Sequence, residues 1–216
     1  MTPSVACEIY RRLAGAYDLS SSGDEFLHFE SPYQILIATI LSAQTTDRMV
    51  NQVTRVLFRE YPGPDALSGA SLPDIEAIIH STGFYHAKAR NIIGAAKALV
   101  SRFDGVVPGT IDELVTIPGV GRKTANIVIH HAFGRAEGIA VDTHVRRLSR
   151  RLGLTASADP VKIEQDLLRI YPREVWGDLN GLFILHGRRV CTSRSPRCES
   201  CILVSLCSSA SRQKVS

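Results

Sequence analysis

Apolar residues recur at helical spacing along almost the whole chain, and this pattern restricts the fold more than any other feature. Within 46–59, for example, Val50, Val53 and Leu57 recur at helical intervals and therefore share one face of a helix. The same spacing predicts helices over 33–42, 73–79, 88–103, 112–116, 123–133, 142–152, 160–170 and 175–188. Alternation typical of strands is scarce, and 138–141 is its best candidate. The sequence predicts an all-α protein.

The predicted helix over 33–42 is apolar on nearly every face. Ser31 and Pro32, just before it, are residue types preferred at an N-cap and at the first helical position. A helix that is apolar all round is buried within a protein. We therefore expect this helix at the centre of a hydrophobic core.

Length and composition exclude several classes of protein. The chain has 216 residues, of which 44% are hydrophobic and 21% charged, as in ordinary globular proteins and unlike disordered or collagen-like chains. No apolar run approaches the ~20 residues of a membrane span, and the N-terminus lacks the pattern of a secretory signal. We expect a cytoplasmic monomer that does not bind membranes, associated with the nucleoid if the source is prokaryotic.

Positive charge is concentrated in the last third of the chain. Residues 1–135 carry 12 Lys or Arg and 13 Asp or Glu, whereas residues 136–216 carry 13 and 8. The arginines form two groups: Arg146, Arg147, Arg150 and Arg151, and then Arg188, Arg189, Arg194 and Arg197. Such a surface would attract a phosphate backbone, although charge alone favours an ordinary solvated face.

Four of the five cysteines lie within 17 residues, as Cys191, Cys198, Cys201 and Cys207. With no secretory signal, a disulfide framework is not expected, and four thiols so close together predict a metal or cluster site. Structural zinc usually has two C-x2-C pairs, of which this segment has one, whereas iron–sulfur clusters also take four cysteines. Spacing alone therefore favours a cluster but leaves zinc open. Cys7, in an amphipathic N-terminal stretch, is expected to be a small core residue.

A glycine turn lies between the predicted helices 112–116 and 123–133. The turn and the start of the second helix read Pro118-Gly119-Val120-Gly121-Arg122-Lys123-Thr124-Ala125. Glycine allows positive φ and close approach to another surface, and amides at a helix start suit a phosphate oxygen. Two glycines alone would indicate an ordinary loop, but the whole string resembles a helix-hairpin-helix motif, which holds one DNA strand through backbone amides.

Together with this hairpin, motifs at 41–47, 83–85, 88–89 and 141–145 and the four cysteines resemble the endonuclease III family of DNA glycosylases. The resemblance covers nearly the whole chain. It implies a six-helix barrel domain over 25–135, with the hairpin at about 112–133. It also implies an iron–sulfur domain built from 1–24 and 136–216, with a 4Fe-4S cluster on the loop 191–207. DNA would run in the groove between the two domains.

The family's catalytic residues correspond to Lys123 and Asp142. The resemblance implies a base-excision-repair N-glycosylase with AP lyase activity, acting on double-stranded DNA that contains oxidised pyrimidines or abasic sites. Lys123 would attack C1′, and the carboxylate of Asp142 would stabilise the electron-poor sugar or help deprotonate the lysine. A free lysine has a pKa of ~10.4, so we expect burial, Arg122 and the helix N-terminus to lower it. Without the resemblance, Asp142 reads as an N-cap.

The resemblance also implies a set of DNA contacts. Gln44 would fill the gap left by an everted base, and Phe84 stands where well-known relatives have a leucine wedge. The remaining expected contacts are Pro118, Gly119, Val120, Gly121, Arg122, Thr124, His144, Arg194 and Arg197. Of these, His144 reads equally well as a structural histidine, and Arg194 and Arg197 would direct positive charge from the cysteine loop at the phosphates.

Two other functions remain open at this stage. One is a mismatch glycosylase on the same scaffold, removing thymine or uracil opposite guanine, or adenine. The adenine branch is disfavoured because it usually lacks a lysine here and carries a further C-terminal domain. The other is a non-enzymatic iron–sulfur module that binds DNA, which would need the hairpin and the basic loop but not Lys123 and Asp142.

Overall fold

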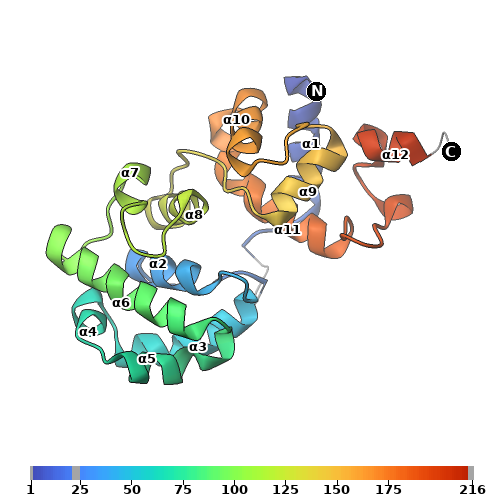
Figure 1. Ribbon diagram of the computed structural model, residues 1–216. Helices are drawn as coiled ribbons and strands as arrows, with labels where there is room; N and C mark the ends of the chain where they lie inside the picture. The colour runs from blue at the N-terminus through green and yellow to red at the C-terminus, as the bar shows by residue number, and fades with distance from the viewer. Residues whose placement is uncertain (1, 21–24, 214–216) are drawn as a thin grey trace. The chain divides into compact units, whose positions relative to one another are not determined.

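The computed structural model describes residues 2–20 and 25–213, and every regular element in those ranges is helical (Figure 1). The all-α prediction is confirmed. The segment 138–141 forms no strand, because the described residues offer no second strand to complete a ladder. Asn180 Nδ2 instead donates to the carbonyl of Ala140 at 2.8 Å. No described helix combines the length and apolar character needed to cross a bilayer.

The chain folds into two compact units. One is Ser22–Arg135, and the other combines Met1–Ser21 with Ala136–Ser216. The start of the predicted barrel domain adjoins residues 21–24, which lie outside the described residues. Each unit has a hydrophobic core of its own. The first helix of the chain therefore belongs with the last third of the sequence.

The unit Ser22–Arg135 is built around α2. Its elements are α2 (Pro32–Leu41), α3 (Asp47–Glu60), α4 (Pro64–Ser68), α5 (Leu72–Ile79), η2 (His80–Thr82), α6 (Tyr85–Arg102), α7 (Ile111–Leu114) and α8 (Arg122–Phe133). Helix α2 packs against α3, α6 and α8, and its residues from Ile35 to Leu41 are all buried. The expectation of a central buried helix is correct.

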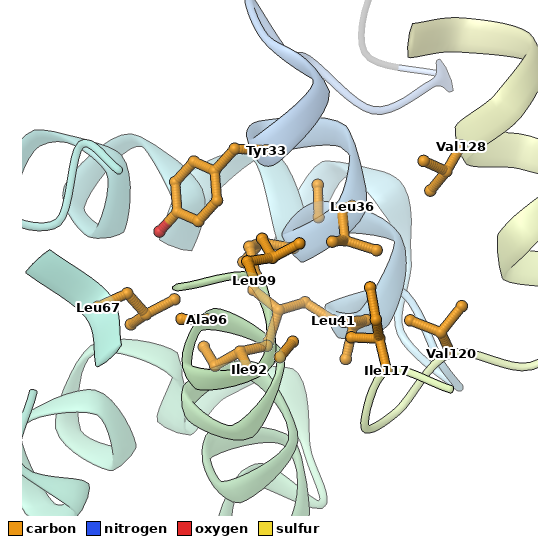
Figure 2. Packing of buried hydrophobic residues seen from close by; sticks show 14 of the residues in the cluster. Tyr33, Leu36, Leu41, Leu67, Ile92, Ala96, Leu99, Ile117, Val120 and Val128 are labelled. Carbon is orange, nitrogen blue, oxygen red and sulfur yellow. The ribbon is translucent and has the colours of Figure 1, made fainter. Parts of the chain in front are cut away.

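Side chains from α2, α6 and the hairpin meet in one apolar cluster (Figure 2). Leu36 and Leu41 of α2 and Leu99 of α6 are completely buried within it. Cutting one such leucine back to alanine costs about 2–5 kcal/mol, because a transfer term and a cavity term add. The cluster thus anchors the hairpin to the centre of the unit.

Capping side chains fix where several helices begin. Ser31 Oγ accepts a hydrogen bond from the Gln34 amide at 3.2 Å at the start of α2, and Thr46 and Ser71 cap α3 and α5 in the same way. Helix α6 instead begins at Tyr85, three residues before the predicted start. Its N-cap, Phe84, has a left-handed backbone with φ 49°, which hydrophobic spacing does not reveal.

The other unit contains α1 (Pro3–Ala16), α9 (Thr143–Leu152), α10 (Pro160–Ile170), η3 (Arg173–Val175), α11 (Trp176–Arg189), η4 (Cys198–Ser200), η5 (Val204–Leu206) and α12 (Ser208–Gln213). Helix α11 packs against both α1 and α9. Helix α1 contributes Ala6, Ile9 and Leu13, which are fully buried and share one face. Cys7 lies off that face and is exposed, so the expectation that it is a core residue is wrong.

Candidate functional site

The turn between α7 and α8 is held tightly against its own unit. The Val120 amide donates to the Ile117 carbonyl at 3.1 Å, and Gly119 has φ +79°, which suits the third position of a type II turn with Pro118 before it. A Cβ atom on Gly119 would lie 2.9 Å from Asn91 Cβ and 3.1 Å from Ile40 Cγ2. This glycine is required by packing as well as by φ.

Gly121 has a different environment from Gly119. A Cβ there would meet nothing within 4 Å, and the residue is the N-cap of α8 with no side chain to cap the helix. Arg122 and Lys123 follow in the first turn and are both exposed, while Thr124 is half-buried. A helix N-terminus that opens onto the surface attracts anions through its amides and its dipole, so this end of α8 can bind a phosphate.

Lys123 presents its amine on the surface of the unit. The residue is exposed, so the expectation that it is buried is wrong. Lys123 directly follows Arg122 in the first turn of α8, where the helix dipole contributes positive potential. An accessible amine in such surroundings can act as a nucleophile once it is neutral.

Asp142 is held by three hydrogen-bond donors at the start of α9. Its Oδ1 accepts from the backbone amides of His144 at 2.9 Å and Val145 at 2.8 Å, and its Oδ2 lies 3.1 Å from His144 Nδ1. The side chain is only 13% exposed. Asp142 is therefore an N-cap, as its position suggested, and also a rigidly oriented negative charge.

The ring of His144 is fixed by a glycine that sequence analysis did not single out. A Cβ on Gly187 of α11 would lie 2.8 Å from His144 Cδ2 and 2.8 Å from Arg147 Nη2. The missing side chain allows α11 to approach α9 closely enough to seat the imidazole beside Asp142. Helical spacing cannot identify such a residue, because its function depends on another helix.

Gln44 and Phe84 share an unusual backbone conformation. Among the described residues other than glycine, positive φ occurs at these two positions, 55° and 49°, and at Asp104. Both side chains are exposed, and that of Phe84 has 70% of its surface accessible. A large apolar side chain on a strained loop is the kind of feature found at binding sites.

The four clustered cysteines surround one cavity. The cavity has a volume of about 230 Å³, and Cys191, Cys198, Cys201 and Cys207 all line it. In the described part of the chain, no three potential ligands converge as they would on a single metal ion. Four thiols around one cavity suit a four-cysteine iron–sulfur cluster.

Hydrogen-bond donors and burial show how these thiols fit a cluster. Arg151 Nη1 lies 3.3 Å from Cys191 Sγ. His186 Nε2 lies 3.5 Å from Cys201 Sγ, while Tyr17 Oη bonds the other ring nitrogen at 2.8 Å. Burial, and then the three neighbouring cysteines, raise the pKa of the Cys201 thiol. Bound iron would offset that repulsion, so the site fits an iron–sulfur group.

The arginines of α9 fall into two sets with different surroundings. Arg147 Nε donates to the Cys191 carbonyl at 3.1 Å, and Arg151 donates to the carbonyls of Thr192 at 2.6 Å and Ser193 at 2.8 Å. These two side chains hold the cysteine loop. Arg146 and Arg150 are exposed instead, so the four arginines are not one solvated patch.

Arg194 and Arg197 lie where the cysteine loop meets solvent. Both are exposed, and both line the rim of the cavity that the four cysteines surround. The Arg197 amide donates to the Val190 carbonyl at 3.0 Å, which closes the loop upon itself. The loop therefore presents two arginines on a backbone that a bound cluster would stiffen.

Comparison with known proteins agrees with this arrangement. Residues 37–173 match the family described as "HhH-GPD superfamily base excision DNA repair protein", and residues 191–207 match the "iron-sulfur binding domain of endonuclease III". The chain is 52% identical over 184 residues to an endonuclease III from Synechocystis, covering 85% of this chain and 84% of that protein. It is 43% identical to the Bacillus subtilis endonuclease III, with coverages of 88% and 89%.

A solved structure is similar over nearly the full length. It is a trapped covalent intermediate of an endonuclease III with DNA, with a TM-score of 0.90 and 39% sequence identity, and the match covers 99% of each chain. The similarity thus extends through the hairpin, α9 and the cysteine loop.

Proposed function

Because this chain belongs to the endonuclease III family, it is a base-excision DNA glycosylase and AP lyase with a 4Fe-4S cluster, and we propose which of its residues do the chemistry. We assign Lys123 as the nucleophile and Asp142 as the carboxylate that supports it. The substrates would be oxidised pyrimidines and abasic sites in double-stranded DNA. The observation that carries the assignment is the exposed amine of Lys123 beside the open Gly121 at the start of α8.

The first step needs the damaged nucleotide outside the base stack, since C1′ is inaccessible within a duplex. We assign Gln44 and Phe84 to fill the space that the flipped nucleotide leaves. The left-handed backbone of both residues and the 70% exposure of Phe84 support this assignment. A phenyl ring can also stack on the neighbouring bases.

Attack at C1′ then proceeds through an electron-poor sugar. The Lys123 amine forms a bond to C1′ as the bond to the base breaks, and the departing base takes up a proton. We assign the Asp142 carboxylate, oriented by the amides of His144 and Val145, to stabilise that positive charge. Because those donors already occupy Oδ1, we favour this electrostatic role over proton abstraction from Lys123.

Strand cleavage follows from the covalent intermediate. The sugar ring opens as the C1′–O4′ bond breaks and O4′ takes up a proton, which leaves an iminium between Lys123 and C1′. The iminium makes the C2′ proton acidic, and loss of that proton breaks the C3′–O bond and expels the 3′ phosphate. The similar solved protein was captured as a covalent intermediate with DNA, which supports a nucleophilic mechanism for this chain. A non-enzymatic DNA-binding module is thereby set aside.

Both units would hold the DNA backbone. We assign the turn from Pro118 to Gly121 and the first turn of α8, including Arg122 and Thr124, as one phosphate site. Arg194 and Arg197 form a second site on the cysteine loop. We assign Cys191, Cys198, Cys201 and Cys207 as the ligands of the cluster, which would cross-link the loop and so fix those arginines. We further expect a monomer acting in the cytoplasm.

Borohydride trapping tests the catalytic assignment. Wild-type protein mixed with duplex DNA containing thymine glycol or an abasic site should give a covalent adduct, and Lys123→Ala should give none. Lys97→Ala, at an exposed lysine of α6, should trap normally. Wild-type protein that cleaves the lesion strand but never traps would refute the Schiff-base step.

A substrate panel separates the proposed specificity from the mismatch alternative. It should compare thymine glycol and dihydrouracil with 8-oxoguanine and with thymine or uracil opposite guanine. Faster release of the two oxidised pyrimidines is expected. Faster release of the mismatched bases would identify a mismatch glycosylase with the same catalytic lysine.

A further inference from the structure

Lys88 lies buried within α6, with only 4% of its surface exposed. Lysine is rarely buried to this extent, because removing its charge from water is costly. Its Nζ donates to Thr45 Oγ1 at 2.5 Å and to the Thr82 carbonyl at 2.9 Å. Both acceptors are neutral, and burial lowers the pKa of Lys88. Because burying this amine costs free energy, its position calls for an explanation beyond core packing.

The two acceptors border on the two loops that carry Gln44 and Phe84, since Thr45 lies in the first loop and Thr82 ends η2 just before the second. Thr45 directly follows Gln44, and Thr82 lies two residues before Phe84. The Thr45 hydroxyl also donates to the Thr82 carbonyl at 2.5 Å, so the three groups form a closed triangle. The backbone amide of Lys88 donates to the Phe84 carbonyl at 3.1 Å as well. Lys88 thus joins the end of one loop to the end of the other.

Both loops hold a residue in a strained backbone conformation. A left-handed backbone costs a residue other than glycine about 1–2 kcal/mol, and it persists only where the surroundings enforce it. Gln44 and Phe84 both adopt this conformation, with φ of 55° and 49°. The hydrogen bonds of Lys88 lie immediately beside each of them, where they can enforce the strained geometry.

We propose that Lys88 is a positioning residue that locks Gln44 and Phe84 into one rigid pair, so that both side chains enter the base stack together when a nucleotide is flipped. The proposal rests on the roles assigned above to those two side chains. Two separately mobile loops would each lose conformational freedom on entering DNA. A pair that is already joined avoids that loss, which lowers the barrier to flipping.

The test compares a substrate that needs flipping with one that does not. Single-turnover rates of Lys88→Met are measured on a thymine glycol in a fully paired duplex and on an abasic site in single-stranded DNA. We expect a loss of about tenfold to a hundredfold on the duplex, the size of a lost hydrogen bond from a charged donor. The rate on the single strand should stay close to wild type.

Further variants distinguish positioning from a general loss of structure. Lys88→Arg, which keeps the charged donor, should recover most of the duplex rate. Lys97→Met removes an exposed lysine of the same helix and should leave both rates unchanged. Thr45→Val removes one hydroxyl, retains the buried lysine, and should give a smaller loss confined to the duplex. It keeps the test decisive if Lys88→Met does not fold.

Gln44→Ala and Phe84→Ala separate failure of this proposal from failure of the proposed function. If both lose duplex activity selectively but Lys88→Met and Thr45→Val lower the two rates equally or not at all, Lys88 does not position the pair. If neither loop variant is selective, the assignment of Gln44 and Phe84 is itself wrong, and the role of Lys88 falls with it.

Discussion

Adding a single methyl group to Gly119 should destabilise the unit that carries the hairpin. In Gly119→Ala the new Cβ would lie 2.9 Å from Asn91 Cβ and 3.1 Å from Ile40 Cγ2, at a φ of +79°. The left-handed backbone costs about 1–2 kcal/mol, and overpacking costs about 1–3 kcal/mol. A total near 3 kcal/mol would lower the melting temperature by roughly 6–12 °C in a chain of this size.

Gly121→Ala is the matched control, because a Cβ there meets nothing within 4 Å. Its stability should change by less than about 1 kcal/mol, the size of an N-cap effect. The added methyl group would face the proposed phosphate site, so affinity for undamaged duplex should fall. Thermal unfolding followed by circular dichroism and fluorescence anisotropy with labelled DNA measure the two effects. Equal melting temperatures for the two variants would refute the packing argument.

Two further predictions concern the unit that holds the cysteines. Replacing Arg194 and Arg197 by alanine should weaken binding to damaged and undamaged DNA alike and reduce the slope of log affinity against log salt by about 0.9 per arginine. Arg55→Ala, at an exposed position of α3, is the control. An unchanged slope in the double variant would show that the cysteine loop makes no phosphate contacts. Arg12 Nη1 donates to the Ile202 carbonyl at 2.9 Å and to Ser205 Oγ at 3.0 Å, both in the loop between Cys201 and Cys207. Arg12→Ala should therefore speed the loss of the cluster to a chelator about tenfold, as expected when hydrogen bonds from a charged donor are lost. Arg11→Ala, which loses only bonds to Glu8, should behave as wild type in the same absorbance assay, and equal rates for both variants would contradict the role of Arg12.

Local signals in the sequence accounted for most of the helices. The buried α2 followed from its uniform apolar character, and Ser31 and Pro32 marked its start because capping depends on neighbouring residues alone. Extended sequence at 138–141 was misleading, since a strand needs a partner that lies elsewhere in the chain. The early start of α6 was missed because Phe84 adopts a conformation that its residue type disfavours.

In the candidate site, too, features set by neighbouring residues could be predicted, and features set by residues distant in the sequence could not. Motif resemblance picked out Lys123, Asp142 and the cysteines, but adjacency in sequence grouped the arginines of α9 wrongly. Arg147 and Arg151 are four residues apart and share a helix face, a signal that could have separated them from the exposed pair. The burial of Lys88 could not be predicted, because its two partners lie in separate segments of the chain.

The placement of α1 has a consequence for how the protein matures on the ribosome. Ala6, Ile9 and Leu13 pack into a core whose other buried residues lie between 139 and 203, and Arg12 bonds the loop between Cys201 and Cys207. The ribosome synthesises this helix well before the residues at 139–203 that pack against it. The contiguous unit Ser22–Arg135 can fold while translation continues, since domains fold as their sequence becomes available. The iron–sulfur unit must wait for its long-range contacts, so iron loading comes after residues 191–207 have been synthesised.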